Sequence, residues 1–148
     1  MQQRDLSAAA SGRVESGLSK AYSSVVFVST IEVVANSVSQ APLLNGWNWV
    51  LLAIALVPIL GMLVWAWRYN VLGVWPYLHG SSTLLVMLMW PWIVVDGDAL
   101  PAEFQPWIWW SLGMSAISVG ITAPLWIGIL YLVTAPTIWF FLDISYFG

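Results

Sequence analysis

An uncharged apolar run from Trp47 to Trp67 is the feature that most constrains how this chain can fold. It reads WNWVLLAIALVPILGMLVWAW, and the first charge after it is Arg68. A helix needs about 20 consecutive apolar residues to cross the hydrocarbon core of a bilayer. The run supplies that length and therefore predicts a membrane-spanning helix.

The composition of the whole chain also predicts a membrane protein. Hydrophobic residues make up 60% and charged residues 7% of the 148 residues, and the mean hydropathy is +0.83. Soluble domains carry about 25% charged residues, so a soluble fold could not cover its surface here. We expect a multi-pass protein of the cell membrane, whose partner is the lipid bilayer that surrounds it. The few basic residues exclude a nucleic-acid surface, and the absence of cysteine excludes disulfides, thiolate metal sites and a cysteine nucleophile.

Four further segments are apolar enough to continue the pattern. The predicted spans are residues 21–44, 47–67, 71–95, 106–123 and 124–142. Pro124 marks the turn between the last two, because proline suits the first turn of a helix and breaks its interior. Residues 1–20 form a polar leader, too long for the charged head of a cleaved secretory signal. The predicted fold is an all-α transmembrane bundle of about five spans within residues 21–148.

The basic residues predict the orientation of this bundle. There are four of them, Arg4, Arg13, Lys20 and Arg68. Cytoplasmic loops carry an excess of Lys and Arg. If residues 21–44 span the bilayer, all four fall on one side, and the acidic loop 96–105 falls on the other. The N-terminus is therefore predicted to be cytoplasmic. Five spans then put the C-terminus outside, so we expect either an end at the outer face or a fragment that lacks a sixth helix.

The chain has twelve tryptophans, and their positions follow the predicted helix ends. Trp and Tyr prefer the headgroup level at both faces of a bilayer. Every tryptophan lies within about two turns of a predicted end. We therefore expect aromatic belts rather than a ligand-binding cluster.

Glu32 is the most informative residue for function. An ionisable side chain inside a spanning helix costs a few kcal/mol and usually faces protein or water. It belongs to a polar stripe with spacings of seven, three, four and four, which consists of Tyr22, Ser29, Glu32, Asn36 and Gln40. This stripe is expected to point away from lipid. Two interpretations stay open: it lines a ligand cavity, a proton path or a partner contact, or it supplies hydrogen bonds between helices.

His79 is the second candidate, in the sequence LHGSST near the predicted cytoplasmic face. It could act as a pH-sensitive switch, or it could be satisfied locally by Ser81, Ser82 and Thr83. One histidine with no cysteine and no nearby carboxylate makes a poor metal site, so we expect no bound metal.

The predicted outer loop carries three carboxylates, Asp96, Asp98 and Glu103. DGD is similar to the start of a calcium loop, but the further oxygen ligands at fixed later positions are absent. The loop is expected to be a solvated turn, or a surface that senses cations or an extracellular partner.

No arrangement of residues typical of an enzyme is present in the sequence. There is no metal cluster, no Ser/His/Asp arrangement and no glycine-rich phosphate loop, so neither catalysis nor a cofactor is expected. Small residues instead predict close helix packing in the last two spans. These are Gly113, Gly120, Gly128, Ser111, Ser115 and Ser118.

Residues 104–142 read FQPWIWWSLGMSAISVGITAPLWIGILYLVTAPTIWFFL. The QPW-x-WW-x-x-G start, the following proline and tryptophan, and a later tryptophan resemble the multi-span N-terminal membrane region of actinobacterial sensor histidine kinases. RYNVLGVWPYLHG and MLMWPW are similar to its preceding helices, and the resemblance covers about residues 47–142. In that region proline and tryptophan are adjacent, whereas Leu125 separates Pro124 from Trp126 here. The resemblance implies a membrane-embedded input domain, with a sixth helix and a kinase domain that this sequence does not contain.

The leading hypothesis is therefore a sensory input module of a two-component kinase that passes a stimulus inward by helix repacking. Glu32, Asn36 and His79 are the predicted coupling residues, and Ser29 and Gln40 share the polar stripe. One alternative is a small non-catalytic accessory subunit of a larger membrane complex, and another is a proton- or cation-coupled carrier component. The expected protein partners are a second copy of the chain or other membrane subunits.

Overall fold

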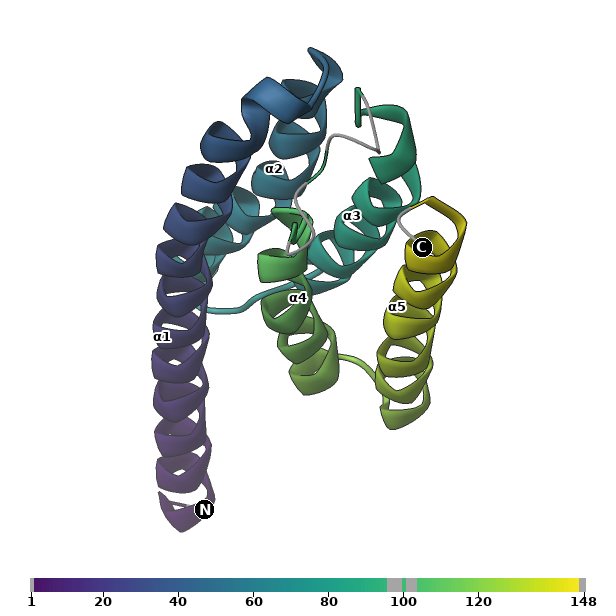
Figure 1. Ribbon diagram of the computed structural model, residues 1–148. Helices are drawn as coiled ribbons and strands as arrows, with labels where there is room; N and C mark the ends of the chain where they lie inside the picture. Colours follow the sequence, from purple (N-terminus) through teal and green to yellow (C-terminus); the bar gives the residue numbers. More distant parts are fainter. Residues whose placement is uncertain (1, 96–99, 101–103, 147–148) are drawn as a thin grey trace.

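The computed structural model describes residues 2–95, 100 and 104–146, and the side chains of residues 10–95, 100 and 104–142. This part of the chain is all-α, as predicted, and its only β-type pairing is an isolated bridge between Leu44 and Val94. Helices that follow one another in the chain run in opposite directions, and α1 begins at the end of the bundle opposite to the one where α5 finishes (Figure 1). The helices are α1 (Gln2–Gln40), α2 (Trp47–Tyr69), α3 (Trp75–Met89), α4 (Ile108–Thr122) and α5 (Leu125–Tyr146), with 3-10 turns η1 (Ala41–Leu43) and η2 (Trp90–Trp92).

Among the described residues, three helical segments are long and apolar enough to cross a bilayer. They are Ala10–Leu43, Trp47–Tyr69 and Leu125–Leu142. The segment Ile108–Thr122 is apolar but shorter. These lengths and compositions indicate a membrane protein.

α1 is a single helix that runs through the position where the sequence predicted the polar leader to give way to a span. Its buried residues recur at spacings of four and three and form one face of the helix. They are Ser19, Ser23, Val26, Thr30, Val33 and Ser37. Because four of these six residues are serine or threonine, the backbones of α2 and α4 can approach α1 closely. The N-terminal part of α1 extends past the other helices (Figure 1).

α3 is shorter than the predicted span 71–95, because the backbone turns sharply on both sides of it. Asn70 adopts the left-handed conformation at φ 61° and ends α2 by donating its N–H to the Ala66 carbonyl at 3.0 Å. Gly73 has a φ of +62°, and a Cβ there would lie 2.9 Å from the Trp65 indole nitrogen. Glycine is therefore required at this position by both its φ angle and its close neighbour. At the other end of α3, Pro91 falls in the tighter turn η2.

Two tryptophans lie in the core rather than in a lipid-facing belt. Trp90 and Trp107 are both 0% exposed and pack edge to face with ring centroids 5.6 Å apart. Aromatic belts were predicted from distance along the chain to a helix end, which does not distinguish an inward side chain from an outward one. The prediction is wrong for this pair, whereas Trp47, Trp92 and Trp126 are exposed as expected.

Close packing of α3 against α4 and α5 makes Gly80 a sensitive position. A Cβ there would lie 2.5 Å from Val119 Cγ2 and 3.1 Å from Tyr131 Cε2. We expect Gly80→Ala to lower the free energy of unfolding by about 1–3 kcal/mol, the usual cost of overpacking. The matched control is Gly113→Ala, because a Cβ at Gly113 meets nothing within 4 Å. Unfolding by SDS in mixed micelles, followed by circular dichroism, measures both, and equal stabilities would contradict the packing.

Candidate functional site

His79 is fully buried, and both of its ring nitrogens contact hydroxyl groups of α4. Nδ1 lies 3.1 Å from Ser118 Oγ, and Nε2 lies 3.2 Å from Ser111 Oγ. The local hydroxyls predicted to satisfy the ring do something else, since Ser82 and Thr83 donate to the His79 carbonyl at 3.0 and 2.9 Å. The imidazole therefore joins α3 to α4 rather than folding back on its own helix.

The spacing of the α4 serines explains why they converge on α3 and α5. Ser111, Ser115 and Ser118 are separated by four and three residues, which gives them one helical face, and all three are buried. Ser115 Oγ lies 2.7 Å from the Tyr131 hydroxyl of α5, and that hydroxyl lies 3.3 Å from the Gly80 carbonyl. The face predicted as close packing is thus also a row of hydrogen-bonding groups.

Tyr22 adds α1 to the same group of contacts. Its hydroxyl oxygen lies 2.7 Å from Ser118 Oγ and 3.2 Å from the Met114 carbonyl oxygen. We call Tyr22, His79, Ser111 and Ser118 the His79 network. It joins three helices through side chains alone.

One assignment of protons satisfies every atom of the His79 network. If Ser118 donates to the Met114 carbonyl at 2.9 Å, its oxygen accepts from Tyr22 and from Nδ1–H of a neutral His79. Nε2 then accepts from the Ser111 hydroxyl, because a neutral imidazole has one donor and one acceptor nitrogen. The network needs no charge, which suits a site without bulk water.

A second polar cluster lies at the other end of the bundle. The Trp107 indole N–H donates to Asn48 Oδ1 at 2.7 Å, and Asn48 Nδ2 donates to Ser37 Oγ at 3.2 Å. Gln40 accepts from the Trp107 backbone N–H at 3.0 Å and donates to the Gln105 carbonyl at 2.7 Å. We call Ser37, Gln40, Asn48 and Trp107 the cap network. It ties α1, α2 and the start of α4 together.

Beside the cap network, one buried donor has no acceptor in the part of the chain that the structure describes. The Trp90 indole N–H has no hydrogen-bond partner there, although the Trp90 ring packs edge to face with Trp107. Such unpaired buried groups are uncommon, because each loses its hydrogen bonds to water. Among the described residues, the packing at this end therefore leaves the Trp90 N–H without a polar contact.

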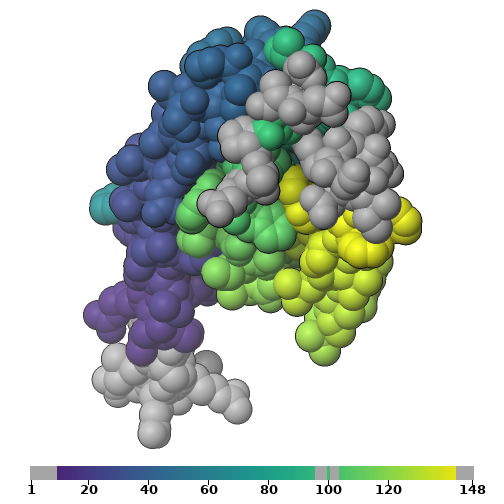
Figure 2. All heavy atoms as spheres, viewed as in Figure 1, coloured from purple at the N-terminus to yellow at the C-terminus, as the bar shows by residue number. Residues whose placement is uncertain are grey.

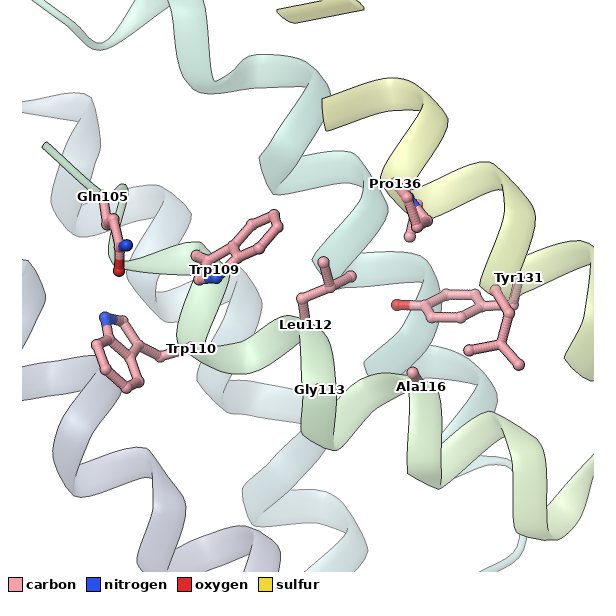
Figure 3. Close-up of a pocket in the computed structure, with 10 residues that line it drawn as sticks. Gln105, Trp109, Trp110, Leu112, Gly113, Ala116, Tyr131 and Pro136 are labelled. Carbon is pink, nitrogen blue, oxygen red and sulfur yellow. The ribbon is translucent and has the colours of Figure 1, made fainter. Parts of the chain in front are cut away.

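An apolar groove of about 440 Å³ lies between α4 and α5. Gly113 and Ala116 leave room on the α4 side, and Pro136 lies on α5 (Figure 3). Tyr131 points from α5 toward α4, with its hydroxyl at the inner side of the groove (Figure 3). A larger groove of about 900 Å³ lies near the N-terminal part of α1, where Glu15 and Tyr22 line it. Tyr22 therefore connects a surface groove with the His79 network.

The predicted polar stripe of α1 does not act as one unit. Glu32 is exposed on the outward side, and the Asn36 amide donates to the Glu32 carbonyl at 2.8 Å. Ser29 donates to the Val26 carbonyl of its own helix at 2.7 Å, whereas Gln40 belongs to the cap network. Glu32 and His79 are not brought together, because one faces outward and the other lies in the core. A proton path through this bundle therefore gains no support from Glu32.

Asp96, Asp98 and Glu103 lie outside the described residues. Within the described part of the chain, no group of three or more His, Cys, Asp or Glu side chains could hold a metal ion.

Sequence reasoning missed Asn48, Trp107 and Tyr131 as parts of polar clusters. Asn48 is the single amide inside the apolar run 47–67, and that position was a usable signal, because an amide in a spanning helix usually bonds across helices. The spacing of the α4 serines was a second signal. Trp107 gave none, because an aromatic residue near a helix end is also typical of a membrane belt.

Comparison of the chain with protein-family models, with curated proteins and with solved structures finds no match. The fold and the polar clusters therefore carry the argument for function.

Asn48 provides a direct test of the cap network. Asn48→Leu leaves the Trp107 indole N–H and the Ser37 hydroxyl without this partner, so the free energy of unfolding should fall by about 1–3 kcal/mol. Asn36→Leu is the matched control, because the Asn36 amide bonds only a carbonyl of its own helix, and its effect should stay within about 0.5 kcal/mol. SDS unfolding monitored by tryptophan fluorescence measures both. Equal effects would show that the cap network does not stabilise the bundle.

Proposed function

We propose that the chain is the membrane-embedded input module of a two-component sensor kinase, in which a change at the outer end of the bundle reaches the cytoplasm through α1. The observation that carries the proposal is the length of α1. Its 39 residues extend roughly 58 Å at 1.5 Å per residue, about twice the thickness of the hydrocarbon core. One rigid helix therefore joins the cap network to a segment beyond the bilayer.

The orientation we propose is five spans with a cytoplasmic N-terminus. Lys20 lies over the Trp67 ring, with its Nζ 5.6 Å from the ring centroid. Lys20 and the neighbouring Arg68 therefore lie at one end of the bundle, together with Arg13 farther along α1. Basic residues at one end support a cytoplasmic location for that end. The cap network then lies toward the outer face.

α4 supplies the connection between the two polar clusters. Trp107, just before α4, belongs to the cap network, and Ser118 belongs to the His79 network. These residues lie eleven positions apart, or about 16 Å along a helix. A movement of α4 at the cap therefore also moves the hydroxyl that holds Tyr22 of α1 and His79 of α3.

The Trp90 indole N–H, which has no partner in the described part of the chain, supports a second arrangement at the cap. A two-state module needs two packings that differ by only a few kcal/mol. In a second packing this N–H could find an acceptor. The hydrogen bond gained would offset part of the free energy lost when the first packing is broken. His79 stays among the predicted coupling residues, while Glu32 and Asn36 are candidates for contacts outside the bundle.

Tyr22→Phe tests the proposal in the protein as its natural gene encodes it. We expect the coding sequence after Gly148 to continue into a sixth helix and a kinase domain. The substitution removes the bond to Ser118, worth about 1 kcal/mol, and should change basal autophosphorylation in membrane vesicles about fivefold. Tyr77→Phe is the control, because its hydroxyl donates to the Thr122 carbonyl at 3.0 Å, outside the His79 network. Equal phosphorylation by the Tyr22 and Tyr77 variants, or a stop codon after Gly148, would contradict the proposal.

A further inference from the structure

A groove of about 460 Å³ lies between α1 and α2. This volume is in the range of small-molecule binding sites, about 300–1,000 Å³. Figure 2 shows α1, coloured purple to blue, along one edge of the molecule with its side chains at the surface. Five of the six residues that line the groove are apolar, and four of those five are exposed, so the groove is open to its surroundings. The lining residues are Ser24, Phe27, Val28, Leu63, Val64 and Trp67.

Lys20 lies at one end of this groove. It precedes Ser24 and Phe27 by four and seven residues, so these three side chains share one face of α1. Lys20 Nζ lies 5.6 Å from the centroid of the Trp67 ring, which lines the groove from the α2 side. Contact with a ring face does not occupy all three N–H donors of an ammonium group, and within the described residues Lys20 forms no ion pair. A positive charge with unused donors therefore lies at the end of an apolar groove.

Ser24 supplies a second unused polar group. Its side chain is half-buried and lines the groove, four residues or about 6 Å beyond Lys20 along the helix axis. In the part of the chain that the structure describes, the Ser24 side chain makes no hydrogen bond. The nearby Ser23 and Ser29 hydroxyls instead donate to carbonyls of α1 at 3.0 and 2.7 Å. Because an unpaired hydroxyl away from water is costly, Ser24 indicates an acceptor on the molecule that fills the groove.

We propose that this groove binds one anionic phospholipid molecule, with its phosphate at Lys20, an ester carbonyl of its glycerol at Ser24 and an acyl chain between α1 and α2. Along a phospholipid the phosphate, the glycerol esters and the acyl chain follow one another in this order. Along α1 a cation, a hydroxyl donor and an apolar surface follow in the same order, at Lys20, Ser24 and Phe27. Basic pockets between spanning helices bind phospholipid headgroups in other membrane proteins. The site holds one lipid in a defined position, which solvation of the bundle by a bilayer does not require.

The charges around the groove favour an anionic headgroup over a zwitterionic one. A zwitterionic headgroup carries a cation beside its phosphate, and Lys20 would repel that cation unless a carboxylate lay beside it. The nearest carboxylates of α1 lie elsewhere. Glu15 lines a different groove, and Glu32 is twelve residues from Lys20, or about 18 Å along the helix axis. Arg68, next to Trp67, adds a second positive charge at this end, so a headgroup with a net negative charge is the better complement.

The lipid affinity of the purified chain tests the site, and it is independent of the signalling proposal because no kinase output is measured. Native mass spectrometry counts the lipids bound to the chain in neutral detergent micelles. The titrations use phosphatidylglycerol, or phosphatidylcholine with the same acyl chains. We expect a dissociation constant about fivefold lower for phosphatidylglycerol. Lys20→Gln should abolish this difference, and Lys20→Arg should keep it, since both cations donate hydrogen bonds to phosphate.

Arg68→Gln is the matched control for the loss of charge. It removes one positive charge at the same end of the bundle, but Arg68 Cζ lies 5.5 Å from the centroid of the Tyr69 ring and Arg68 does not line the groove. This variant should keep the preference for phosphatidylglycerol. Ser24→Ala should weaken the binding of both lipids roughly fivefold, because the ester carbonyl is common to both. Equal effects of Lys20→Gln and Arg68→Gln, or equal affinity of the unchanged chain for the two lipids, overturn the proposal.

A second pair of variants separates a lipid in the groove from attraction by charge alone. Val28 lines the groove and Val25 does not, although their side chains are 60% and 58% exposed on the same helix. Val28→Trp fills the groove and should raise the dissociation constant for phosphatidylglycerol on the order of tenfold, whereas Val25→Trp should change it by less than about twofold. Circular dichroism in the same micelles checks that both variants stay helical. Equal binding by the two variants overturns the groove as the site of the acyl chain.

Discussion

The middle of the bundle depends on one buried imidazole. His79 has two ring nitrogens and lies where water cannot reach them, so each needs a hydrogen-bonding group from the protein. Both contacts come from α4, which fixes the rotation and the height of α4 against α3. Tyr22 then uses the same Ser118 hydroxyl, so α1 is held in register with that pair. Helix packing in lipid has no hydrophobic effect to drive it, and shared polar contacts of this kind set which faces meet.

The positions of the helices were predicted from the lengths of the apolar runs and from the proline, glycine and basic residues at their ends. The run from Trp47 to Trp67 fixes α2 almost to the residue, because a charged residue follows it and the bilayer sets its length. The start of α3 was missed by four residues, since the left-handed Asn70 and the close approach at Gly73 depend on Trp65 across the turn. The polar leader predicted at residues 1–20 was compatible with a helix, and α1 is helical from Gln2. A polar sequence does not stop a helix, whereas a break needs a residue such as proline.

The candidate site was harder to predict, because periodicity gives a face of a helix but not its direction. The stripe from Tyr22 to Gln40 was correctly polar, but its two ends bond to α4 and to the segment before it, while Glu32 in the middle faces outward. The buried side of α1 consists instead of serine, threonine and valine. It contains no charged residue by which it could be recognised in the sequence. In a soluble protein the charged side of a helix faces water. In a spanning helix an ionisable side chain is expected to face protein or water, yet Glu32 faces away from the bundle, so polarity did not orient α1 correctly.

α1 is held by hydrogen bonds at two points along its length. Tyr22 shares the Ser118 hydroxyl of α4, and Gln40 accepts from the Trp107 backbone N–H just before α4. These residues of α1 lie 18 positions apart, or about 27 Å along the helix axis. A rotation of α1, or a slide along its axis, breaks both contacts together. A change of crossing angle about one contact breaks only the other, so it is the smaller rearrangement of α1 that the two contacts allow.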